Sequence, residues 1–68
     1  MEELIRQSEL KIISVEGKYI NLDHHYRVEI ENESLFKLTH EGSVIAPFDD
    51  GPELIDFVLM DMRLNGLI

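Results

Sequence analysis

The chain has 68 residues, a formal net charge of −8 and no cysteine. A domain of this length buries only about 60% of the surface that its unfolded chain exposes, so it needs a disulfide, a metal or a partner chain to gain more than marginal stability. Without cysteine, disulfides and thiolate metal sites are excluded, and the acidic excess disfavours direct binding of nucleic acid. Oligomerisation is therefore the first expectation.

The negative charge permits two interpretations. A net charge of magnitude about 2–8 is common in small domains and keeps them soluble. Alternatively, the acidic surface binds a basic protein partner, in the extreme case by imitating DNA. The acidic N-terminal residues lack the apolar stretch of a signal peptide, and no segment approaches the roughly 18 apolar residues of a membrane span. We expect a cytoplasmic protein that does not bind membranes.

Residues 1–9 suit one or two helical turns in which Leu4 and Ile5 point the same way. A helix this short is not stable without docking onto other elements. We predict a short N-terminal helix or arm.

Residues 10–48 alternate apolar and polar side chains, which is the pattern of β-strands. Turn signals at residues 15–17, 23–25, 32–34 and 40–42 divide this region into five strands. If each loop has three residues, Ile12 faces Ile20, Leu38 faces Val44, and His40 lies opposite Tyr26. The apolar residues then share one sheet face. They are all even-numbered: Leu10, Ile12, Ile20, Leu22, Tyr26, Val28, Ile30, Phe36, Leu38, Val44 and Ala46.

The odd-numbered face is mixed and carries one apolar cluster, formed by Ile13, Val15 and Tyr19. A cluster of this kind can be a contact patch. The alternative is that Leu4 and Ile5 fold over it. Both interpretations remain open.

The last third of the chain predicts one helix with signals at both ends. Asp50 is a good N-cap, and Glu53 three residues later completes a capping box. Gly66 suits the left-handed position after a helix, with Leu67 folding back onto Met62. The helix should have about four turns.

This helix has two apolar stripes. One is broad and is the natural core face; the other consists of Phe57, Met60 and Leu64, at spacing i, i+3, i+7. In addition, a five-stranded sheet spans roughly 20 Å, whereas one helix covers about 10 Å. The part of the sheet that the helix leaves uncovered has three possible remedies. The sheet could coil strongly around the helix, the N-terminal segment could lie beside the helix, or a second subunit could cover the gap. We favour a two-fold homodimer, because it also buries the second stripe.

The only residues that resemble metal ligands are His24, His25 and His40, with Asp23. Zinc accepts imidazole and carboxylate ligands, but adjacent histidines in a turn point in different directions, so polar loop residues are the simpler interpretation. No catalytic, cofactor or nucleotide motif is present. We therefore predict no catalytic residues, no metal site and no cofactor.

The sequence thus predicts an α+β domain over residues 1–68: a five-stranded antiparallel β-meander packed on one face by a C-terminal helix, with a short N-terminal helix or arm. The expected function is that of an acidic, non-enzymatic protein-interaction module, homodimeric or bound to a basic protein. The first candidate surface is Phe57, Met60 and Leu64. The second is Ile13, Val15 and Tyr19 with the nearby Glu29 and Glu31. The alternative is a ligand- or metal-binding accessory domain that uses His24, His25 and His40.

Overall fold

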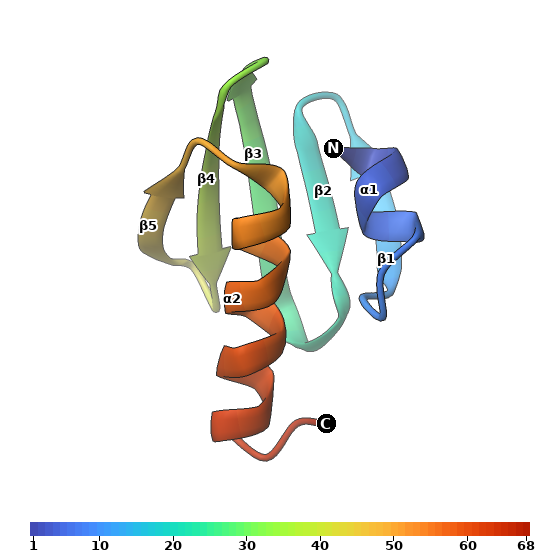
Figure 1. Cartoon of the computed structure of the whole chain (residues 1–68), viewed down its shortest axis with the longest axis vertical. Helices are drawn as coiled ribbons and strands as arrows, with labels where there is room; N and C mark the ends of the chain where they lie inside the picture. The colour runs from blue at the N-terminus through green and yellow to red at the C-terminus, as the bar shows by residue number, and fades with distance from the viewer.

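The computed structural model describes all 68 residues and confirms the α+β meander. Five antiparallel strands form one sheet in the order β1-β2-β3-β4-β5. Both helices lie on the same face of this sheet (Figure 1). In chain order the elements are α1 (Glu2–Arg6), β1 (Ile12–Glu16), β2 (Tyr19–Leu22), the 3₁₀ turn η1 (Asp23–His25), β3 (Tyr26–Asn32), β4 (Leu35–His40), β5 (Ser43–Phe48) and α2 (Gly51–Leu64).

The core lies between the sheet and the two helices. Every buried residue of the sheet region has an even number, as the alternation predicts, and each helix contributes its apolar face. No buried side chain is charged, so the stability of the core comes from apolar burial. The twelve buried residues are Ile5, Leu10, Ile20, Leu22, Tyr26, Val28, Phe36, Leu38, Leu54, Ile55, Val58 and Met62.

The short helix α1 covers the part of the sheet that α2 cannot reach. Ile5 is fully buried in the common core, and α1 contacts α2 beside β1 and β2 (Figure 1). Leu4 packs so close to Gly51 that a Cβ added there would lie 2.7 Å from its Cδ2 atom. The N-terminal segment is therefore what resolves the mismatch in width, and that mismatch gives no argument for a second subunit.

The register of the three central strands agrees with the prediction as far as the pair Ile30–Phe36, beyond which a bulge pairs Asn32 with Leu35 and shortens the predicted three-residue loop to two residues. The register of the first hairpin differs from the prediction along its length. Ile12 pairs with Leu22 where Ile20 was expected, and Val15 pairs with Ile20 beyond a β-bulge. The reason is that the loop has two residues instead of three, with Gly17 at a φ of 60°. A two-residue hairpin loop with glycine at its first position is a favoured connection, and the bulge then restores the even face.

The last hairpin departs from the prediction for the same reason. Glu41 and Gly42 form a two-residue loop in which both residues have positive φ, 52° and 84°, as type I′ turns require. Leu38 consequently pairs with Ala46 instead of Val44. Val44 pairs with Thr39 across a bulge, so its side chain points away from the core and is 61% exposed.

Helix α2 has the predicted N-cap and the predicted C-terminal motif, but the Glu53 side chain does not make the reciprocal bond of a capping box. A side-chain oxygen of Asp50 accepts the Glu53 N–H at 3.0 Å. At the other end, the Leu67 N–H donates to the Met62 carbonyl at 2.8 Å and the Gly66 N–H donates to the Arg63 carbonyl at 3.1 Å, which is a Schellman motif. Neither helix has the length and apolar character needed to cross a lipid bilayer.

Candidate functional site

Three apolar side chains lie on the side of α2 that is not fully buried, and we call them the outer face of α2: Phe57, Met60 and Leu64. Met60 is 48% exposed and Leu64 is 77% exposed. Phe57 is half-buried because its ring lies against that of Phe48, with 5.5 Å between the ring centroids. The structure therefore brings the predicted residues together on one helix face, and two of the three, Met60 and Leu64, are exposed to water.

Charges flank this face asymmetrically along the helix. Glu53 and Asp56 are exposed in the N-terminal half, and Arg63 is exposed near the C-terminus. Neither acid forms an ion pair within the chain. Arg63 makes one loose contact with Glu9, at 3.8 Å between exposed groups, which is worth little in water. All three charges remain available to a neighbouring molecule.

The apolar cluster predicted on the odd-numbered face is not continuous. The bulge in β1 places Val15 on the core side of the sheet, at its edge, whereas Tyr19 lies on the opposite side. Ile13 is exposed. The Tyr19 ring is instead flanked by cations, with Lys18 Nζ at 5.6 Å and Arg27 Cζ at 5.1 Å from its centroid. Leu4 and Ile5 pack on the core side, so the expectation that they cover this cluster is wrong as well.

The two glutamates of β3 are already paired with lysines. Lys18 Nζ lies 3.3 Å from a carboxylate oxygen of Glu29, and Lys37 Nζ lies 3.0 Å from one of Glu31. The hydrogen bond and charge of Glu31, followed by the charge of Glu29, raise the pKa of Lys37. Glu29 and Glu31 therefore do not form an uncompensated acidic stripe.

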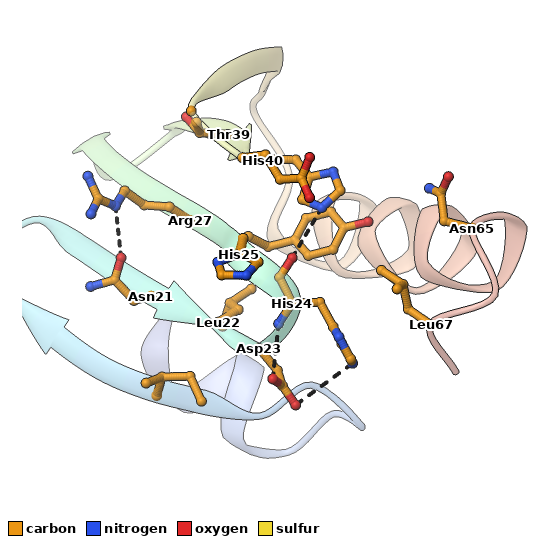
Figure 2. Close-up of a pocket in the computed structure, with 14 residues that line it drawn as sticks. Asn21, Leu22, Asp23, His24, His25, Arg27, Thr39, His40, Asn65 and Leu67 are labelled. Carbon is orange, nitrogen blue, oxygen red and sulfur yellow. Dashed lines mark hydrogen bonds and ion pairs between the residues drawn. The ribbon is translucent and has the colours of Figure 1, made fainter.

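An open groove of about 880 Å³ lies at the end of the sheet that carries the histidines (Figure 2). His40 lies opposite Tyr26, as the hairpin register predicts, and the two rings stack at 3.9 Å with an interplanar angle of 4°. The carbonyl oxygen of His24 lies 3.1 Å from Nε2 of His40 and accepts from its N–H tautomer. This bond ties the turn η1 to the end of β4.

Tyr26 joins this end of the sheet to α2. It is buried, and its hydroxyl donates to Asp61 Oδ2 at 2.5 Å. Burial, followed by the hydrogen bond and charge of Asp61, raises the pKa of Tyr26 well above its ordinary value. The sequence pattern placed Tyr26 in the core without revealing this partner. A buried tyrosine needs a hydrogen-bond partner for its hydroxyl, which was the available signal.

His24 and His25 both have left-handed backbones, with φ of 60° and 68°. This conformation costs a residue with a Cβ roughly 1–2 kcal/mol. Strained backbone of this kind is concentrated at binding and active sites. Even so, no group of three His, Asp or Glu side chains lies close enough to hold one metal ion.

Replacing His25 by glycine should stabilise the domain by about 0.5–1 kcal/mol, because glycine removes the backbone strain at φ 68° and the cost in chain entropy offsets only part of the gain. The His25 side chain is exposed and makes no hydrogen bond, so its loss should cost little. Thermal denaturation measures the effect. His40→Gly serves as the contrast and should destabilise, since His40 stacks on Tyr26.

The residues available for function are therefore the outer face of α2 with its flanking charges, and the groove around the histidine turn. Compared with known proteins, the chain matches no protein-family model, no curated protein sequence and no solved structure.

Proposed function

We propose that this chain is a small, acidic, non-enzymatic protein-interaction module that forms a homodimer through the outer face of α2. The observation that carries the proposal is the exposure of Met60 and Leu64 on a helix whose opposite side is already buried. Full burial of such a side chain contributes about 1.5–3 kcal/mol. A cytoplasmic location is part of the proposal and is supported by the cysteine-free composition.

A basic protein is the other occupant that the charge of −8 would suit. The two occupants respond oppositely to salt. Screening weakens the attraction between an acidic and a basic protein, whereas it relieves the repulsion between two copies of an acidic chain. We propose the homodimer because the ion pairs of Glu29 and Glu31 remove the most obvious acidic stripe.

Met60→Glu should weaken self-association at least about tenfold, because it places a charge in the middle of the apolar contact. Sedimentation velocity from about 10 to 500 µM measures the change. Val44→Glu is the matched control, since Val44 is similarly exposed but its side chain points from the sheet face opposite the helices. A wild-type chain that sediments as a 7.9 kDa monomer throughout, or equal effects of the two substitutions, contradicts the proposal.

The second candidate function is a ligand-binding accessory role for the groove lined by His24, His25 and His40. Its support is the pair of consecutive left-handed histidines at the rim. Thermal melting with and without Zn²⁺ tests the metal form of this role. A rise in melting temperature that His25→Ala abolishes supports it, and an unchanged melting temperature argues against it.

A further inference from the structure

Building on the proposed self-association, we infer that two copies pair their α2 helices antiparallel about a two-fold axis, so that Arg63 of each chain meets Asp56 and Glu53 of the other. This goes beyond the existence of a dimer, because it fixes the orientation of the partner and names the polar contacts that select it. Three properties of α2 support this orientation: the spacing of its apolar residues, the order of its charges and its contact area.

The apolar spacing suits helix-to-helix packing. Phe57, Met60 and Leu64 follow the alternating three- and four-residue steps of a coiled-coil seam, and Glu53 occupies the preceding seam position. In an antiparallel pair, Phe57 of one chain packs against the partner's Met60, and Leu64 packs against the aliphatic stem of the partner's Glu53. The half-burial of Phe57 against Phe48 fixes the N-terminal end of this seam in place.

The order of charges along α2 selects the antiparallel direction. Asp56 lies in the first half of one flank and Arg63 in the second half, while Glu53 lies at the N-terminal end of the seam itself. A parallel pair would set each flank against the opposite flank of the partner, so Asp56 would lie beside the partner's Asp61, another acid. An antiparallel pair brings Arg63 to the partner's acids twice, once on each side of the axis, and also opposes the two helix dipoles. Asp61, the remaining acid of this part of the helix, is engaged by Tyr26 within its own chain.

The contact area indicates a weak, concentration-dependent dimer. A helix of 14 residues is about 21 Å long, and one such pair buries less than the roughly 800 Å² per partner of a standard stable interface. The same surface is used by both chains about a two-fold axis, so assembly stops at two copies and does not propagate. Charges at the flank then matter more to orientation than to affinity.

A charge-reversal cycle tests the polar contacts. Asp56→Lys and Arg63→Glu should each weaken dimerisation about fivefold, because each places like charges together twice per dimer. The double variant restores the opposite-charge contact between residues 56 and 63 on both sides of the axis and leaves Glu53 facing the new glutamate at position 63. It should therefore bind more tightly than either single variant and more weakly than the wild type. If the dissociation constant of the double variant rises by the product of the two single-variant increases, the two residues do not meet across the interface and the inference is overturned.

Cysteine substitution tests the orientation directly, because the chain has no cysteine of its own. In the antiparallel pair, Leu64 lies about 16 Å along the axis from its own copy, beyond the roughly 7 Å Cα separation that a disulfide spans. Leu64→Cys alone should therefore remain uncrosslinked under mild oxidation. A mixture of Leu64→Cys and Glu53→Cys chains should give the mixed disulfide, identified by its mass, and a Val44→Cys control should give none with either.

The outcomes separate this inference from the proposed function. A wild-type chain that stays monomeric removes both. In the other case, Met60→Glu dissociates the dimer but Leu64→Cys chains crosslink to each other. That result supports the proposed function and overturns the antiparallel orientation.

Discussion

Replacing Ile5 by alanine is expected to lower the free energy of unfolding by about 2–5 kcal/mol. Ile5 is fully buried although it belongs to a helix of only five residues. A domain of 68 residues has a total stability of roughly 3–10 kcal/mol. The loss of one side chain from α1 should therefore consume a large part of that total, because α1 covers the first strands of the sheet.

Urea denaturation followed by circular dichroism measures the effect of Ile5→Ala. Glu3→Ala is the matched control, since Glu3 lies in the same helix, is exposed and makes only a 3.3 Å hydrogen bond with Gln7. Its effect should stay within about 0.5 kcal/mol. Equal stabilities of the two variants would mean that α1 is not docked in solution.

Tyr26→Phe is expected to cost about 1–3 kcal/mol at neutral pH, because it deprives the partly buried Asp61 carboxylate of its 2.5 Å hydrogen bond. The aromatic ring and its stacking on His40 are retained. Tyr19→Phe is the control, since Tyr19 is half-exposed on the outer face of the sheet. Chemical denaturation of the three proteins gives the comparison, and equal losses in both variants would contradict the role of Asp61.

The same tyrosine predicts how stability depends on alkaline pH. Burial and Asp61 raise the pKa of Tyr26 in the folded chain, so the folded state holds this proton more tightly than the unfolded state. The protonated Tyr26 hydroxyl therefore contributes to the free energy of unfolding. This contribution is fully present below about pH 10, the ordinary pKa of tyrosine, and is lost as the pH rises above that value. Tyr26→Phe should remove this part of the alkaline loss of stability, which denaturation at pH 9 to 11 would measure.

The alternation of apolar and polar residues was sufficient to predict the sheet, its strand order and its buried face. Because only one side of the sheet is buried, each strand must pair in the register that turns its even-numbered apolar side chains toward that side. The alternation could not predict the outer hairpins. A two-residue loop with a bulge and a three-residue loop both place the even-numbered residues beyond the bulge on the core side, so Ile20 and Ala46 are buried or half-buried either way. The two loop types differ in the side of the sheet on which they place Val15 and Val44, and that side depends on the local backbone conformation of the loop.

Helix signals gave α2 and its two caps correctly because they are local. The sequence also placed Phe57, Met60 and Leu64 on one face, but it could not show that Phe57 would find Phe48 within the same chain. The bond between Tyr26 and Asp61 joins residues 35 positions apart. Pairing of this kind depends on where α2 lies over the sheet, which no short-range pattern specifies.

The two edges of the sheet have a consequence for how other chains can meet this one. β1 is interrupted by a bulge, and β5 contains Pro47, which has no N–H to donate, beside a bulge of its own. An incoming strand would therefore meet gaps in the row of backbone donors and acceptors at either edge, which is how natural sheets resist edge-to-edge aggregation. Recognition by main-chain addition is disfavoured on both sides, so contacts with this molecule fall to its side chains.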